Sequence, residues 1–387
     1  MKILFVGQAD SSHTVRWIRQ LEGTGWDCHL FPAEHFRNIN PELRNVMVHS
    51  LFRTPSLPPT VRESAFIPWS ANVGRTFTER LLVRAGVDDA RRLARVIRRV
   101  KPDVVHSLCV HIGGFPTRAA REIVGTPFPR WLVSNLGLDV YYFRHFEEYA
   151  GRIRAVLSSC DEYLCECHRD VPLAREFGFK GKDWPVLPQA GGLDLARMTE
   201  LRRRRAPSER RLILVKGYQH FYGRALVALK AVELCATDLA GYRVALFGVS
   251  GADVEFTARV VSTRTGVPIE IIPRSPHDRI LELQSHARVC ISLSVADAAC
   301  TTFLEAMAAG AFPVQSNTGC SAEWAAHGEG ALFVDPDDPH DVATALRRAV
   351  TDHALVDRAA EVNWGPVVAG LDQEKIRAVV LERYRAP

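Results

Sequence analysis

Short apolar runs alternate with amphipathic repeats along the first half of the chain. Residues 2–7 form an apolar run that ends at Gly7. In the following segment, 13–23, Val15, Ile18 and Leu21 recur at spacings of three, as on one face of a helix. Further short strands are expected at 26–32, 104–106 and 131–135. This alternation predicts βαβ units and a parallel sheet.

The second half of the chain repeats the scheme. Strands are expected at 211–216, 242–248, 269–272, 289–293, 312–315 and 331–334, with helices at 225–235 and 302–309 between them. A charge run with a proline and no strand pattern lies between Asp194 and Glu209 and marks a boundary. We therefore expect two domains, 1–195 and 205–370. An amphipathic helix within 372–387 is expected to pack back on the first.

Length and composition agree with this organisation. The chain has 387 residues, which at roughly 100–200 residues per domain suggests two domains. The predicted class is α/β, with two Rossmann-like, doubly wound parallel sheets facing a central cleft and ligands beyond the carboxyl ends of the strands. Because apolar runs all fall short of the ~18–20 residues that span a bilayer, no membrane helix is expected. The N-terminal segment is typical of a strand rather than a signal peptide.

The cysteine content and the net charge indicate which cellular compartment and which classes of binding partner to expect. The nine cysteines are scattered, and we interpret them as reduced side chains that pack in the interior of a cytoplasmic protein. A net charge of +5 is compatible with an anionic substrate but is too small to indicate nucleic-acid binding.

Two segments each allow two interpretations. Residues 87–101 predict a basic amphipathic helix, with arginines crowded between Arg91 and Arg99. Such a helix either makes weak peripheral contact with an anionic membrane or is a surface helix whose apolar stripe faces the core. The proline-rich segment 53–76 is either an acceptor-site loop or a surface insertion.

Candidate chemistry is densest at 292–310. Asp297 lies in the loop after an expected strand, and Glu305 lies within the first turns of the next helix. Thr301 and Thr302 are placed to cap that helix and donate to an anion, because helix N-termini favour phosphate. The plainer alternative is an ordinary strand–loop–helix with solvated acids.

This stretch resembles the signature of the retaining GT-B glycosyltransferases of family 4, the glycosyl transferases group 1. Their pattern is an acidic residue, seven residues and Glu, followed by Ala-Met-Ala-x-Gly. Here the match is Asp297, Glu305 and the run from Ala306 to Gly310, although many members have Glu where this chain has Asp297. The resemblance implies two Rossmann-like domains, a nucleoside-diphosphate sugar donor of the UDP or GDP type, and retention of anomeric configuration. We expect no cofactor and no metal, because Lys216, Arg224 and a helix dipole can neutralise a diphosphate without one.

The resemblance also suggests a donor site. Lys216 and Arg224 would grip the diphosphate, Asp297 the sugar hydroxyls and Glu305 the ribose. The order of the two cations differs from the commoner arrangement in the family. The full expected donor set is Lys216, Gly217, Arg224, Gly248, Asp297, Thr301, Thr302 and Glu305. Asp297, Lys216 and His111 are the expected catalytic residues.

The acceptor site is expected in the first domain, at strand ends and at the link between domains. The loop after the first strand carries capping and donor groups, and two histidines flank a later strand end. The candidates are Gln8, Ser11, Ser12, His13, His106, His111, Asn135, Asp139, Gly191 and Gly192. Carboxylates at 335–338 could imitate a metal motif, but we interpret them as a turn and helix N-cap.

The expected activity is that of a hexosyltransferase-type glycosyltransferase (EC 2.4). Its acceptor would be a small natural product or a cell-envelope glycan or lipid intermediate. Two alternatives have the same architecture: a nucleotide-sugar epimerase, and a non-catalytic partner of an active transferase. An epimerase would convert the donor without any acceptor.

Overall fold

The computed structural model describes residues 1–33, 38–67 and 88–386. The described chain divides into two compact units. The first comprises the described residues of Met1–Gly191 and Arg377–Pro387, and the second comprises Gly192–Ile376. The part of the proline-rich segment from residue 68 onward lies outside the described residues.

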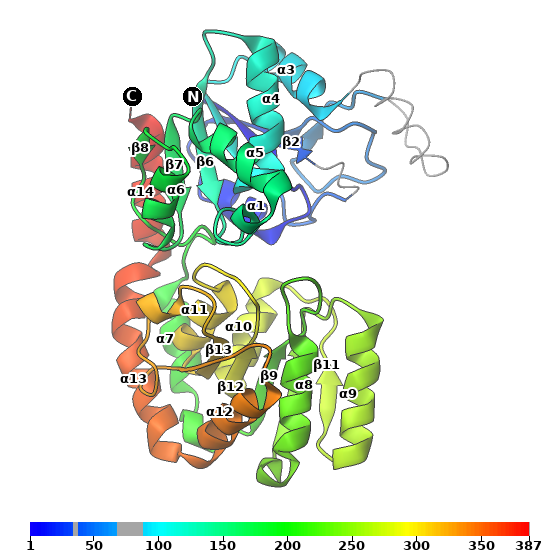
Figure 1. The fold of residues 1–387 in the computed structure, drawn as a ribbon, viewed down its shortest axis with the longest axis vertical. Coiled ribbons are helices and arrows are strands. Elements are labelled where there is room, and N and C mark those ends of the chain that lie inside the picture. Colours follow the sequence, from blue (N-terminus) through cyan, green and yellow to red (C-terminus); the bar gives the residue numbers. More distant parts are fainter. Residues whose placement is uncertain (34–37, 68–87, 387) are drawn as a thin grey trace. The chain divides into compact units, whose positions relative to one another are not determined.

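The first unit is built on an eight-stranded parallel sheet with the order β4-β3-β2-β1-β5-β6-β7-β8 (Figure 1). Its strands are β1 (Lys2–Gly7), β2 (Asp27–Pro32), β3 (Met47–Val48), β4 (Arg62–Glu63), β5 (Val104–Ser107), β6 (Arg130–Asn135), β7 (Glu162–Cys165) and β8 (Lys182–Asp183). Its helices are α1 (Ser12–Arg19), α3 (Asp89–Val100), the π-helical segment η2 (Cys109–Gly114), α4 (Phe115–Val124), α5 (Glu147–Leu157) and α6 (Asp170–Glu176).

The second unit has a six-stranded parallel sheet with the order β11-β10-β9-β12-β13-β14. Its strands are β9 (Leu212–Lys216), β10 (Arg243–Phe247), β11 (Ile269–Ile271), β12 (Ala287–Ser292), β13 (Phe312–Ser316) and β14 (Leu332–Val334). Its helices are α7 (Leu195–Arg203), α8 (Ala225–Leu234), α9 (Ala252–Thr265), α10 (His277–His286), α11 (Thr301–Ala309), α12 (Pro339–Thr351) and α13 (His353–Gly370). The last helix, α14 (Gln373–Arg385), starts in this unit and continues into the first.

Helices cover both faces of the second sheet, which explains the unbroken apolar runs of its strands. Side chains alternate between faces along a strand. In β9, Ile213 and Val215 therefore join the core under α8, α9 and α12, while Leu212 and Leu214 pack on the opposite side with α10 and α11. Every strand predicted from the sequence in this half is present, and the sheet is parallel as expected.

One face of the first sheet is closed by α1 and α14. Trp17 of α1 donates its indole N–H to the Tyr384 hydroxyl of α14 at 2.8 Å, and both side chains are buried. The last turns of the chain thus complete the core of the first unit.

Helix α3 matches the basic amphipathic helix predicted at 87–101. Its apolar residues Leu93, Ile97 and Val100 are buried, and Arg92 is buried in an ion pair with Asp89. The apolar stripe therefore faces the core, which favours the surface-helix interpretation. Within the described residues, none of the helices has the length and apolarity needed to cross a membrane.

Candidate functional site

Each sheet has a topological switch point, which is the place where successive chain connections run to opposite sides of one strand. The chain leaves β1 for β2 on one side and later returns to β5 on the other, and in the second sheet β9 lies between β10 and β12. In doubly wound sheets, ligands bind at the carboxyl ends of the strands at such points. Most of the residues proposed from the sequence lie at or after the ends of these strands, and the exceptions are Asn135, Asp139, Gly191 and Gly192.

Lys216 ends β9 at the second switch point and is half-buried. Its ammonium Nζ lies 3.8 Å from Cys300 Sγ and 4.6 Å from the centre of the Tyr218 ring. Burial tends to lower the pKa of Lys216, but Cys300, Asp297 and Tyr218 outweigh it and hold this pKa above its ordinary value. The site therefore keeps a fixed positive charge at neutral pH.

Asp297 lies in the β12–α11 loop, and its Oδ1 accepts a hydrogen bond from the Ala298 N–H at 2.9 Å. The helix α11 begins at Thr301, one residue before the expected start, and its N-cap is Cys300. The prediction that Thr301 and Thr302 cap the helix is therefore wrong: both lie inside the first turn, where Thr302 is buried. Thr301 remains half-buried beside the helix N-terminus.

Glu305 is only 5% exposed on α11. Its Oε1 lies 2.6 Å from Nε2 of His277, the first residue of α10. Because the imidazole is partly exposed and the carboxylate is buried, His277 fixes one carboxylate oxygen from the solvent side. The sequence pattern gave no indication of His277.

Arg224 occupies the N-cap position of α8, and its Nε lies 2.5 Å from Oδ1 of Asp337. In this structure the Arg224 guanidinium is therefore paired with a carboxylate.

Asp338 is the N-cap of α12, which confirms the turn and cap expected at 335–338. Gly217 and Gly248 follow β9 and β10, and the Gly217 N–H donates to the Phe247 carbonyl at 2.8 Å.

The first switch point opens on a pocket. Gln8, Ser11 and His13 from the β1–α1 loop line it, together with Cys109 and Gln189. Ser11 is the N-cap of α1, as expected, and accepts from the His13 N–H at 3.2 Å. The neighbouring Ser12 is exposed and lies outside the set of pocket-lining residues.

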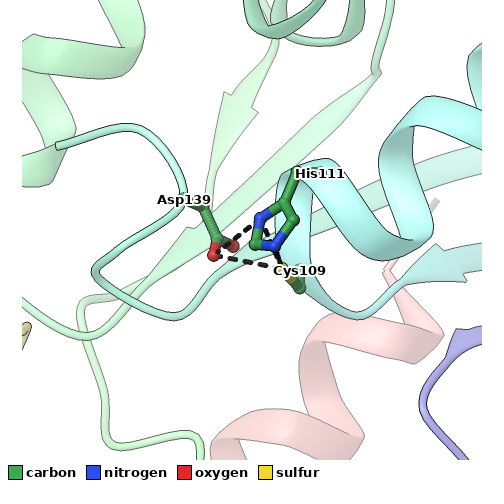
Figure 2. A group of neighbouring side chains, drawn as sticks. All are labelled: Cys109, His111 and Asp139. Carbon is green, nitrogen blue, oxygen red and sulfur yellow. Dashed lines mark hydrogen bonds and ion pairs between the residues drawn. The ribbon is translucent and has the colours of Figure 1, made fainter. Parts of the chain in front are cut away.

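Beside this pocket the structure brings His111 and Asp139 together with Cys109 (Figure 2). Cys109 Sγ lies 3.0 Å from Asp139 Oδ1 and 3.1 Å from His111 Nδ1, and the last two atoms are 3.4 Å apart. Asp139 is 2% exposed. Burial opposes its ionisation, but contacts with His111 and Cys109 hold its pKa below the ordinary value.

The backbone around Cys109 is unusual. Its φ of 79° lies in the left-handed region, which non-glycine residues rarely adopt, and it opens the π-helical segment η2. Gly113 closes that turn against β1, where a Cβ would lie 2.2 Å from the Val6 carbonyl oxygen. The loop is thus fixed tightly to the strand end, and strain of this kind is often found at functional sites.

Two of the acceptor-site predictions need correction. His106 is fully buried, with Nδ1 2.5 Å from the Tyr384 hydroxyl and Nε2 2.7 Å from the Ser134 hydroxyl. Burial lowers its pKa to about 3, so the ring is neutral. Asn135 is also enclosed, donating from its amide to Tyr163 and Asp170. Both side chains belong to the core rather than to an acceptor surface.

The unit boundary falls between Gly191 and Gly192, just before the segment 194–209 where we expected it. That segment is not a linker throughout. Asp194 caps α7, and Met198 and Leu201 of this helix are buried in the second unit.

Four residues that contact the predicted site residues were not among the candidates proposed from the sequence. Cys109, Tyr218, His277 and Cys300 all touch predicted residues. A Cys-x-His pair in one strand-end loop was a readable signal for Cys109. His277 and Glu305, by contrast, lie on different helices, and no local spacing links them.

Family models match both halves of the chain. Residues 2–150 match the model described as "Glycosyl transferase 4-like", and residues 198–363 match "Glycosyl transferases group 1". A comparison with curated protein sequences gives no significant match.

Solved structures resemble the chain over its whole length. Sucrose-phosphate synthase from Thermosynechococcus elongatus is 15% identical, with a TM-score of 0.68 over 100% of this chain and 98% of that one. HepE from Anabaena in complex with UDP-glucose is 13% identical, with a TM-score of 0.67 and 99% of each chain covered. An α,α-trehalose-phosphate synthase (UDP-forming) from Burkholderia vietnamiensis is 14% identical, with a TM-score of 0.68 and 99% of each chain covered.

The architecture is therefore the GT-B fold, with two Rossmann-like parallel-sheet units. With family models matching both units, the protein is a glycosyltransferase.

Proposed function

We propose that the protein transfers a hexosyl group from a nucleoside-diphosphate sugar to an acceptor, with retention and without a divalent cation at the diphosphate. The observation that carries the proposal is the charged Lys216 at the β9–β12 switch point, with Asp297 and Cys300 beside it. A fixed cation at a strand end suits a diphosphate leaving group.

The donor would be of the UDP type rather than the GDP type. Supporting this choice, HepE forms complexes with UDP and with UDP-glucose, and the trehalose-phosphate synthase is described as UDP-forming. We assign the ribose to Glu305, the sugar hydroxyls to Asp297 and the diphosphate to Lys216. Arg224 would join the diphosphate site after exchanging Asp337 for phosphate oxygens.

The acceptor would enter the pocket of the first unit. Gln189 supports this assignment, because its Oε1 is buried without a hydrogen-bond partner among the described residues, while its Nε2 donates to the Asn135 carbonyl at 2.7 Å. An acceptor hydroxyl would supply the missing donor. The acceptor class stays open between a small natural product and a cell-envelope glycan or lipid intermediate.

Retention is proposed from the resemblance to family 4. The bond between the anomeric carbon and the diphosphate oxygen breaks, and a bond to the acceptor oxygen forms on the same face of the sugar. The acceptor proton passes to the departing phosphate oxygen, so the protein needs no dedicated base. The residues contribute charge stabilisation and orientation.

We also propose a cytoplasmic location. All nine cysteines are free thiols buried in the structure, which suits a reducing compartment.

A thermal-shift panel of nucleoside diphosphates tests the donor assignment. UDP at 100 times its dissociation constant should add about 2.7 kcal/mol of stability, with or without Mg²⁺. Incubation with UDP-sugars, with and without acceptor mixtures, then separates transfer from epimerisation. Absence of any nucleotide-dependent shift, or conversion of the donor without an acceptor, would overturn the proposal.

A further inference from the structure

We propose that Cys109, His111 and Asp139 form a binding site for a divalent zinc-class ion in the first unit. Figure 2 shows the three side chains pointing toward one another, two from the η2 turn after β5 and one from the loop after β6. This inference goes beyond the transfer reaction, and it departs from the sequence-based expectation that the protein holds no metal.

The geometry converges on single atoms. Cys109 Sγ, His111 Nδ1 and Asp139 Oδ1 form one triangle with sides of 3.0, 3.1 and 3.4 Å. A tetrahedral zinc ion with bonds of ~2.0–2.3 Å spaces such ligands about 3.3–3.6 Å apart. To share an ion, the three atoms must therefore separate by a few tenths of an ångström, and the His111 ring must turn its Nδ1 lone pair toward the ion, because Cys109 Sγ also lies 3.9 Å from Nε2.

A nucleophilic triad would look different. In a Cys–His–Asp relay, the imidazole bridges its partners with its two different ring nitrogens. Here the thiol and the carboxylate approach the same nitrogen, Nδ1, whereas Nε2 lies 3.9 Å from Cys109 Sγ. A single nitrogen cannot relay a proton between the thiol and the carboxylate. Three donor atoms that face one point are instead the arrangement expected of ligands around one cation.

Surrounding groups orient the ligands. Asp139 Oδ2 accepts from the Val110 N–H at 2.8 Å and the Leu136 N–H at 3.2 Å, which turns Oδ1 toward the triangle. The His111 ring packs against Phe143 at 4.6 Å between ring centres. Such outer contacts are typical of metal sites, where they fix ligand orientation.

Charge and softness select the ion. A thiolate and a carboxylate neutralise a divalent cation, and the thiol proton leaves to solvent when the ion binds. Sulfur with imidazole favours zinc over magnesium or calcium. Three protein ligands leave a fourth position for water, and Cys109 lines the pocket of the first unit. The ion would also tie the loops after β5 and β6 together.

Cobalt and zinc titration of the full chain, without donor or acceptor, tests the site. After treatment with a chelator and its removal, the wild type should bind one equivalent of Co²⁺ with a thiolate-to-cobalt charge-transfer band. Zn²⁺ should displace the cobalt and raise the melting temperature. Wild type that binds neither ion overturns the proposal, and this result is independent of nucleotide binding.

Variants assign the ligands. Cys109→Ser keeps a hydroxyl beside Asp139 and should lose the charge-transfer band. His111→Asn and Asp139→Asn should each weaken zinc binding by at least about tenfold. Cys160→Ser, which changes another buried cysteine of the same unit, is the control and should keep the band. A band that survives in Cys109→Ser would place the metal elsewhere and refute the assignment.

Discussion

His277 Nε2 lies 2.6 Å from Glu305 Oε1, so the start of α10 holds the most enclosed carboxylate of the proposed donor site. The contact joins two helices that follow different strands of the second sheet. It gives His277 a positioning role: the imidazole orients the carboxylate that would bind the ribose.

Removal of Glu305 should therefore have a larger effect on the enzyme than removal of His277. Glu305→Ala should reduce turnover by at least ~10²-fold, on the scale of a lost preorganised charge. His277→Ala should weaken UDP binding by about tenfold, because Glu305 remains but is no longer fixed. A steady-state assay measures the turnover of Glu305→Ala, and calorimetric titration measures UDP binding by the His277 variants. His277→Asn should restore part of the affinity. Equal losses in His277→Ala and His277→Asn would argue against orientation through this contact.

Lys216→Ala should lower kcat by at least ~10²-fold, because the fixed charge at the end of β9 is lost. Lys230 of α8 provides the control, since its side chain is exposed and pairs with Glu233. Lys230→Ala should leave the rate within about twofold of the wild type. A steady-state assay with saturating donor makes the comparison, and a near-normal rate for Lys216→Ala would remove this lysine from the reaction.

Arg224 is paired with Asp337, so in the proposed donor site a phosphate would have to displace this carboxylate. Asp337→Asn should therefore raise UDP affinity by about two- to fivefold, on the scale of one partly exposed ion pair. Arg224→Ala should lower it. Binding constants from titration decide the sign, and weaker binding in Asp337→Asn would show that the ion pair supports the site instead.

Tyr384→Phe should destabilise the first unit by about 2–4 kcal/mol, because the Trp17 N–H and a ring nitrogen of His106 lose their buried partner. Tyr149→Phe is a suitable control, since its hydroxyl makes no hydrogen bond within the described residues and a change within about 0.5 kcal/mol is expected. Urea unfolding measures both. Equal stabilities would mean that the Tyr384 hydroxyl contributes nothing net.

His106 makes stability depend on pH. Its folded pKa is about 3, below the ordinary 6.5, so the unfolded chain binds the proton more readily. The stability from this group is complete above pH 6.5 and is lost as the pH falls toward 3. At pH 5 the loss is about 2 kcal/mol. In His106→Gln the difference in unfolding free energy between pH 7.5 and pH 5 should shrink by that amount, and an unchanged difference would exclude His106 as its source.

Strands could be predicted from the sequence where both sheet faces are covered. The apolar runs of β1 and β9 are continuous, because alternate side chains enter two different cores. The edge strands β4 and β8 and the neighbouring strand β3 have two residues each, and Lys182–Asp183 in β8 is polar, so no periodic signal marks them. Helix α7 could not be distinguished from a charged linker in the sequence, because Met198 and Leu201 are its only buried residues.

Only those site residues that lie at the ends of strands could be predicted from the sequence. Lys216 and Asp297 follow strands, and the topology brings their loops together. Partners such as His277 for Glu305 carry no local signature. His106 also follows this rule: the sequence places it at a strand end, but its partner Tyr384 lies 278 positions away and draws the ring into the core.

The return of α14 to the first sheet has a consequence for biosynthesis. The first unit is discontinuous, with Gly192–Ile376 interposed between its two parts. On the ribosome, its sheet emerges well before the tyrosine that closes one face of that sheet. Final consolidation of the first unit therefore waits until the entire second unit has been synthesised, and a fragment ending at Gly191 would expose Trp17 to chaperones and proteases.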